Sequence, residues 1–151
     1  RGWLPQGVKL MDTKQTQLIL NNWISREFSS AISHPHGERE RSMRVLEEAI
    51  ELCQACGITE PDMQVITKRC MNRPVGDVRT EVQQVGITFL AFCASKGYSA
   101  DELITIELLK ILNRPQGYFT RRMREKVLAM PSLYSMREVN AAKQYLEAEQ
   151  K

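Results

Sequence analysis

The stretch Val82–Ala94, which reads VQQVGITFLAFCA, decides the fold. It is apolar on almost every side of a helix, so we expect a helix over residues 77–95 that is largely buried. A narrow polar stripe runs along this otherwise apolar helix at positions i, i+4, i+7 and i+11. It consists of Asp77, Glu81, Gln84 and Thr88. Buried polar groups need partners, so a second polar surface is expected to face this stripe. Asp77 has an alternative interpretation as the N-cap of the helix.

Helical spacing extends outward from this stretch in both directions. Breaks rich in Gly, Pro, Asn and His separate the periodic segments, and no alternating run is long enough for a sheet. We therefore predict an all-α fold, a bundle of four main helices with additional C-terminal helices. Residues 12–151 are expected to form one domain, and residues 1–11 an N-terminal extension or tag remnant, because Met11 resembles a start. The helices are expected at 13–31, 38–55, 59–71, 77–95, 99–112, 119–130 and 132–149.

Composition excludes several classes of protein. The chain has 151 residues, of which 42% are apolar and 26% charged, as in an ordinary globular domain. Its 21 Lys and Arg against 18 Asp and Glu give a net charge of +3, which permits phosphate ligands but is low for a nucleic-acid partner. No apolar run reaches the roughly 20 residues of a membrane span. Four cysteines in a chain of this size do not indicate a disulfide framework, so a cytoplasmic location is expected.

Residues 38–55 carry the most informative polar cluster, Glu47, Glu48 and Glu51. At about 100° per residue these three carboxylates share one face of a helix. Apolar residues flank the face on both sides, so it is expected to border the bundle interior. Crowded carboxylates repel one another, and such oxygen-rich clusters suit Mg²⁺ or Mn²⁺. The alternative is a solvated face on which Arg44 pairs with Glu48 at i,i+4.

Two motifs together resemble a known family. Glu47–Glu51 reads EEAIE and Glu81–Gln84 reads EVQQ, with the turn NRPVGD at 72–77 between them. The pair is similar to the EExxE and ExxD signature of the MazG-like all-α nucleoside triphosphate pyrophosphohydrolases. The surrounding sequence, RVLEEAIEL at 44–52 and EVQQVG at 81–86, resembles a short viral and bacterial subgroup of this family. The resemblance covers roughly residues 38–130.

The resemblance implies a specific activity. Such enzymes bind two or three Mg²⁺ or Mn²⁺ ions and hydrolyse a nucleoside triphosphate to the monophosphate and pyrophosphate. It implies that Glu47, Glu48, Glu51 and Glu81 bind the metals, and that one of the first three positions or deprotonates the attacking water. Gln84 departs from the signature, which has Asp there, and Asp77 on the same face could replace the missing charge. By resemblance alone, the substrate would be dGTP or GTP in nucleotide-pool control, in the host cytoplasm if the chain is viral.

The expected substrate-binding residues are basic or amide side chains. The family carries an Asn–Lys–Arg segment after its fourth helix, and Asn113-Arg114 and Arg121-Arg122 look similar to it without aligning. Arginine suits phosphate oxygens by charge and geometry. The alternative is an exposed basic face. With Arg44 and Gln84 the expected set is Arg44, Gln84, Asn113, Arg114, Arg121 and Arg122.

Other interpretations remain beside this one. The runner-up is a non-catalytic α-helical protein that binds nucleotides or partners, and the third is a nucleic-acid binder that uses Arg121, Arg122, Arg124 and Lys126 beside Tyr118 and Phe119. A P-loop NTPase is excluded because no Gly-Lys-Ser/Thr loop is present. A di-iron bundle needs Glu-x-x-His on two helices, and both histidines are expected outside helices.

We also expect a homo-oligomer, a tetramer rather than a dimer. Related pyrophosphohydrolases assemble in this way, and the chain carries more apolar surface than one small bundle covers. The side chains that support this expectation are Leu18, Ile19, Trp23, Leu133, Tyr134, Val139 and Tyr145.

Overall fold

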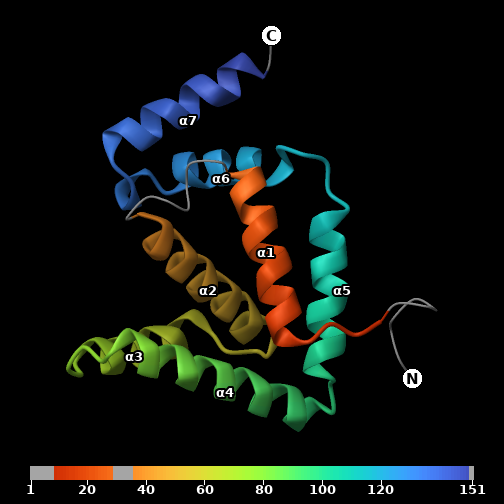
Figure 1. Cartoon of the computed structure of the whole chain (residues 1–151). Helices are drawn as coiled ribbons and strands as arrows, with labels where there is room; N and C mark the ends of the chain where they lie inside the picture. Colours follow the sequence, from red (N-terminus) through yellow and green to blue (C-terminus); the bar gives the residue numbers. More distant parts are fainter. Residues whose placement is uncertain (1–8, 29–35, 150–151) are drawn as a thin grey trace. The chain divides into compact units, whose positions relative to one another are not determined.

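The computed structural model describes residues 9–28 and 36–149, and every regular element in those ranges is a helix (Figure 1). This confirms the predicted all-α fold. The arrangement of four main helices as a bundle stays a prediction, because α6 is the described helix that packs most extensively, and it does so against α7 and η1. The elements are α1 (Thr13–Glu27), α2 (His36–Ala55), α3 (Glu60–Met71), α4 (Val78–Lys96), α5 (Ala100–Leu112), α6 (Tyr118–Ala129), the 3-10 turn η1 (Pro131–Leu133) and α7 (Met136–Ala148).

Most helices begin and end within two residues of their predicted positions, and α7 is the main exception. It begins at Met136 rather than at residue 132. Ser135 caps it, because the Ser135 N–H donates to Glu138 Oε2 at 2.8 Å and the Glu138 N–H donates to Ser135 Oγ at 3.3 Å. The preceding residues Pro131–Leu133 form the separate turn η1.

The first two helices also differ from expectation at the break between them. The predicted end of α1 at residue 31 falls outside the described residues, and the structure shows α1 as far as Glu27. Helix α2 begins at His36, so the placement of both histidines outside helices is wrong for this one. No Glu stands three residues before either histidine, so the sequence still lacks the Glu-x-x-His pattern of a di-iron site.

Two compact units make up the chain. Unit 1 comprises Arg1–Ile32 and Asp101–Lys151, and unit 2 comprises Ser33–Ala100. In the described parts of the chain, unit 1 therefore holds α1, α5, α6, η1 and α7, and unit 2 holds α2, α3 and α4. A single domain over residues 12–151 stays a prediction.

Unit 1 has a small apolar core between α6 and α7. Val127, Val139 and Ala142 are exposed by only 4%, 5% and 0%, and Leu128 and Tyr134 pack against them. The spacing of Val139 and Ala142 places them on one face of α7. Apart from this cluster, α5 carries the buried Thr105 and Leu108, and the Met11 N–H donates to Thr105 Oγ1 at 3.4 Å.

Part of the surface that predicts a homo-oligomer in the sequence is used inside unit 1. Val139 and Tyr134 belong to the core, so they are not available to a partner. Trp23 meets Phe28 and Phe119 edge to face, with ring centroids 5.8 Å and 5.1 Å apart. Leu18 remains exposed.

Unit 2 buries few of its described side chains. Cys93 is its buried residue among those described, whereas Val82, Val85 and Ile87 of α4 are exposed by 66%, 54% and 69%. The prediction that residues 77–95 are largely buried is therefore wrong for this chain as described. A helix that is apolar all round needs neighbours on every side, and within unit 2 neither α2 nor α3 packs extensively on α4 among the described residues. No described helix combines the length and hydropathy that a membrane span requires.

Candidate functional site

Three glutamates of α2 form the predicted acidic face. Glu47, Glu48 and Glu51 lie on one uninterrupted helix, and its period places them on the same side, as the sequence predicts. Glu48 and Glu51 are exposed and Glu47 is half-buried. Within residues 9–28 and 36–149, no hydrogen bond or ion pair involves the carboxylates of Glu48 and Glu51. Two of the three carboxylates are thus open to a ligand from solvent.

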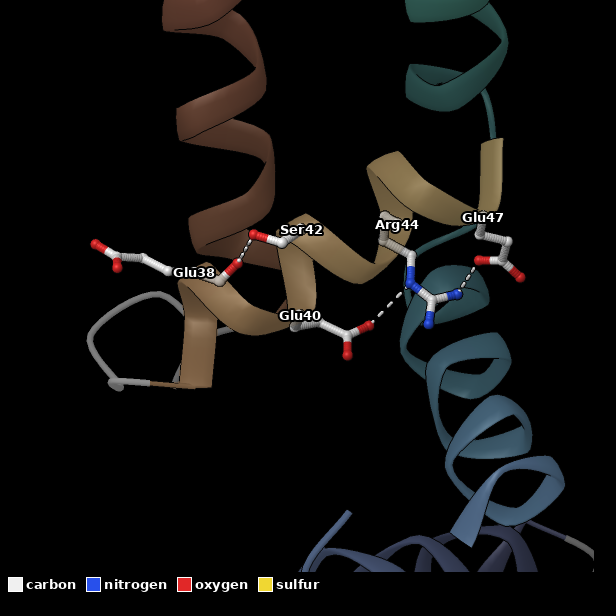
Figure 2. Close-up of polar contacts among 5 residues, drawn as sticks. All are labelled: Glu38, Glu40, Ser42, Arg44 and Glu47. Carbon is white, nitrogen blue, oxygen red and sulfur yellow. Dashed lines mark hydrogen bonds and ion pairs between the residues drawn. The ribbon is translucent and has the colours of Figure 1, made fainter. Parts of the chain in front are cut away.

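Arg44 is held by carboxylates on both sides of it along α2. Its Nε lies 3.1 Å from Glu40 Oε1, and its Nη1 donates to Glu47 Oε2 (Figure 2). The expectation that Arg44 pairs with Glu48 is wrong, because the guanidinium is engaged at i−4 and i+3 instead. Both partners lie within one helical turn, where side chains meet at these spacings. Glu47 is therefore the one member of the acidic face that already has a cation beside it.

The N-terminal part of α2 is a dense cluster of charges. Ser42 Oγ donates to the Glu38 carbonyl at 2.9 Å, as helical hydroxyls often do (Figure 2). Burial lowers the pKa of the Arg41 guanidinium, the nearby Glu40 raises it in part, and Arg44 lowers it again. These charges sit one to three turns before the acidic face and set the electrostatic background of the motif.

Asp77 is the N-cap of α4, which confirms that interpretation of it. Its Oδ2 accepts hydrogen bonds from the Thr80 N–H at 3.0 Å and from Thr80 Oγ1 at 3.2 Å. A metal ligand at this position would share its carboxylate with the helix cap. Both hydrogen bonds go to Oδ2, so Oδ1 accepts none within the described part of the chain.

Glu81 folds back toward the turn that precedes α4. Its carboxylate lies in the space that a Cβ at Gly76 would fill, so any side chain at residue 76 would have to displace it. Glu81 and Gln84 are exposed, and within the described ranges neither side chain makes a hydrogen bond or ion pair. The stripe of α4 is therefore accessible rather than enclosed.

The structure does not gather these carboxylates into a metal site. Among the described residues there is no group of three or more His, Cys, Asp or Glu side chains placed to hold a metal ion. The face on α2 and the stripe on α4 both belong to unit 2, so this holds within a single unit. Carboxylate oxygens suit Mg²⁺ or Mn²⁺ chemically, but within one chain these carboxylates do not lie close enough together to bind one ion.

Basic residues of unit 1 gather around one aromatic ring. The Arg114 and Arg122 guanidinium carbons lie 4.8 Å and 5.9 Å from the centroid of the Tyr118 ring. They line a hollow of about 90 Å³, so two of the predicted substrate-binding residues do share a surface. The hollow is completed by Glu107, Lys110, Ile111 and Phe119.

Arg121 and Asn113, the other two predicted substrate-binding residues of unit 1, do not line this hollow. Arg121 Nε lies 3.1 Å from Glu125 Oε1 and 3.8 Å from Glu149 Oε2, so its charge is already balanced. Asn113 follows α5 in an exposed turn. The structure thus brings together Arg114 and Arg122 and leaves Arg121 engaged elsewhere.

Glu27 is a site residue that the sequence analysis missed. Its Oε1 accepts the N–H groups of Phe119 and Thr120, both at 3.1 Å, and its Oε2 accepts that of Gly117 at 3.2 Å. Helix α6 follows Gly117, which has no side chain to cap it, so its free N–H groups need an acceptor from elsewhere. That missing cap is the available signal, although nothing local identifies a residue ninety positions away.

A larger hollow, of about 500 Å³, lies between α2 and α3. It shares Ile50 with the helix that carries the acidic face, but none of the motif carboxylates lines it. Its walls are Ile50, Gln54, Glu60, Met63, Gln64, Thr67 and Lys68.

Comparison with known protein families, with curated proteins and with solved structures found no match for this chain. Its function must therefore be argued from its own residues.

Proposed function

We propose that this chain is a metal-dependent nucleoside triphosphate pyrophosphohydrolase that releases pyrophosphate and a nucleoside monophosphate. The observation that carries the proposal is the acidic face of α2, where Glu48 and Glu51 are exposed and unpaired among the described residues. Carboxylates on one helix face repel one another, and a bound cation would relieve that repulsion. Glu81 on α4 adds a fourth carboxylate in the same unit.

Mg²⁺ or Mn²⁺, two or three ions, would be the cofactor that these residues hold. The donor set of Glu47, Glu48, Glu51 and Glu81 fits hard divalent cations by chemistry. Its placement in one chain does not bring three of them together, so no reaction step follows from the present geometry.

Arg44 links the acidic face to the proposed substrate. Its guanidinium now neutralises Glu47 and Glu40. If Glu47 binds a cation, Arg44 loses one partner and becomes available to phosphate oxygens, which guanidinium groups bind well. The expected substrate is a purine triphosphate, dGTP or GTP, with Gln84, Asn113, Arg114, Arg121 and Arg122 as further contacts. A cytoplasmic location and a homo-oligomer, tetramer or dimer, belong to the same proposal.

The second candidate is a non-catalytic helical protein that binds nucleotides or partners. Two observations favour it: Asp77 is committed to the cap of α4, and the described carboxylates form no metal cluster. The third candidate, a nucleic-acid binder, is weakened by the ion pairs of Arg121 with Glu125 and Glu149.

A substrate panel separates these functions. The purified chain is incubated with each NTP and dNTP and with Mg²⁺ or Mn²⁺, and pyrophosphate is resolved from orthophosphate. The proposal predicts pyrophosphate as the first product and its loss with excess EDTA. Orthophosphate as the sole initial product, activity that survives EDTA, or no turnover of any nucleotide would contradict the proposal, and the last would favour the second candidate.

A further inference from the structure

Two cysteines lie in the last turn of α2 and directly after it. Cys53 and Cys56 stand three residues apart in the run CQAC, and both are free cysteines in the described chain. Cys53 is half-buried and Cys56 is exposed, so solvent reaches the second thiol directly. The other two cysteines offer a contrast, because the exposed Cys70 and the buried Cys93 have no second cysteine near them in the sequence. Cys53 and Cys56 are therefore the candidate pair for thiol chemistry.

Hydrogen bonds fix the backbone around this pair. The Cys56 N–H donates to the carbonyls of Leu52 and Cys53, at 3.1 Å and 3.0 Å. The Ile58 N–H donates back to the Cys53 carbonyl at 3.0 Å. Gly57 between them has a φ of +82°, the left-handed conformation in which glycine commonly ends a helix. Residues 53–58 thus form a Schellman motif, and both cysteines belong to it.

The geometry of this turn suits a disulfide. Residues three apart in a helix have Cα atoms about 5 Å apart, by the rise and radius of the helix. A disulfide accepts Cα separations of about 4.4–6.8 Å. In an ordinary helical turn the Cβ atoms would be about 5–6 Å apart, whereas a bridge needs about 3.5–4.5 Å. The hydrogen bond from Cys56 to Cys53 is of the 3-10 type, in which side chains three apart eclipse each other, so this turn brings the two thiols closer together.

We propose that Cys53 and Cys56 form a reversible disulfide by exchange with a low-molecular-weight disulfide such as glutathione disulfide. The thiolate of the exposed Cys56 attacks one sulfur of glutathione disulfide, breaks its S–S bond and releases one glutathione thiolate. The Cys53 thiolate then attacks the Cys56 sulfur of this mixed disulfide and displaces the second glutathione. The two cysteines lose two electrons, which reduce glutathione disulfide to two glutathione thiolates. The two protons from the cysteine thiols pass to these thiolates.

The pair lies close to two features of unit 2. Glu51 of the acidic face precedes Cys53 by two residues, and Gln54, between the cysteines, lines the hollow between α2 and α3. The Cβ atoms must still approach each other for the bridge to close, so the bond should be easy to reduce, as labile disulfides are. Bridges of this kind occur in cytosolic proteins as transient, redox-sensing bonds. The exchange needs neither metal nor nucleotide, so its test is independent of the proposed hydrolysis.

Mass spectrometry of the full chain tests the exchange. The reduced protein is incubated with excess glutathione disulfide at about pH 8.5, where roughly half of an ordinary thiol is ionised, and the remaining thiols are then alkylated. We expect the peptide with Cys53 and Cys56 to lose two hydrogen atoms and to carry no glutathione, while the exposed Cys70 carries an adduct. Excess glutathione should then restore both thiols. Glutathione on both Cys53 and Cys56, a bridge from either to Cys70, or a pair left reduced would overturn the proposal.

Two variants separate the geometry of the turn from closeness in the sequence. Cys53→Ser should leave Cys56 with a lasting glutathione adduct, because the thiol that would displace the glutathione is gone. Cys56→Ser combined with Ala55→Cys keeps two thiols but places them two residues apart, where helical side chains do not face each other. We expect this matched variant to form at least about tenfold less bridge than the wild type under the same conditions. Equal bridge formation would show that the turn does not position the pair, and would overturn the proposal.

Discussion

Unit 1 and unit 2 differ in how far they bury their apolar side chains. In unit 1, Val127, Val139 and Ala142 are removed from water between α6 and α7, and Trp23 reaches across to Phe119. In unit 2, α4 leaves Val82 and Val85 largely exposed. Both units are helical, so helix formation alone does not separate them. The comparison teaches that unit 1 has a buried apolar cluster, whereas α4 of unit 2 leaves most of its large apolar side chains exposed in this chain.

The largest expected effect lies in unit 2 and concerns activity. Glu51→Gln removes one carboxylate from the acidic face with little change of shape. We expect turnover to fall by at least about a hundredfold, the scale of losing a metal or general-base contribution. Steady-state release of pyrophosphate measures it. Glu38→Gln, an exposed change on the same helix outside the motif, is the matched control and should retain near-wild-type turnover.

The same variant sharpens the stability side of the comparison. Without metal, Glu51→Gln should be equally stable or more stable, because one repulsion is removed. It should also lose part of the stabilisation that Mn²⁺ gives, since a ligand that binds only the folded state raises the melting temperature. A wild-type melting temperature that does not change with millimolar Mn²⁺ would support a solvated acidic face instead.

The next effect is expected in the core of unit 1. Val139→Ala should lower the free energy of unfolding by about 2 kcal/mol, because it leaves a cavity beside Val127 and Ala142. Urea unfolding followed by circular dichroism measures the change. Leu18→Ala, at a side chain that is 62% exposed, should stay within about 0.5 kcal/mol of the wild type. Equal losses for the two variants would remove the distinction between packed and unpacked helices.

Glu27→Gln should cost unit 1 somewhat less. The carboxylate accepts three N–H groups at the start of α6, and an amide replaces one acceptor oxygen by a donor. We expect a loss of about 1–2 kcal/mol in the free energy of unfolding. Glu107→Gln, which breaks only the exposed pair with Lys110, should cost less than about 1 kcal/mol. A cost for Glu27→Gln no larger than this control would refute the capping role.

The smallest effect concerns alkaline pH. The hydrogen bond with Glu149, then burial, raises the pKa of the Tyr145 phenol above its ordinary value. The folded state therefore holds this proton more tightly than the unfolded state. The resulting stability is complete below the unfolded pKa of about 10 and is lost as pH rises through the higher folded pKa. Unfolding curves between about pH 9 and 11 should show a shallower decline for Tyr145→Phe than for the wild type; identical slopes would contradict this.

Local sequence predicted the helices well, because their signals are local. Asp77 caps α4 as its position suggests, and Gly97 ends that helix with a positive φ. The start of α7 at Met136 shows the limit of local prediction. Ser135 and Glu138 form a capping box there, which competes with an earlier start of the helix. The cap of α6 by Glu27 lies beyond local reasoning, because the two are separated by ninety residues in the chain.

The candidate site was predictable only in part. The helical period alone places Glu47, Glu48 and Glu51 on one face. The choice of Arg44 between Glu47 and Glu48 depends on rotamers that spacing does not fix. Whether the stripe of α4 meets this face depends on how the helices pack. An apolar sequence predicts that a helix is covered without identifying its neighbour, and in the described chain α4 stays exposed.

Native-state hydrogen exchange at two protein concentrations tests the central claim most directly. Exchange reports local opening free energies for each helix, and a partner stabilises what it covers in proportion to its concentration. The proposed homo-oligomer would cover exposed apolar side chains of α4 such as Val82 and Val85. We predict that the amides of α4 become more protected as concentration rises through the micromolar range, while those of α6 and α7 do not change. Protection of α4 that is independent of concentration and equal to that of α6 would contradict the account.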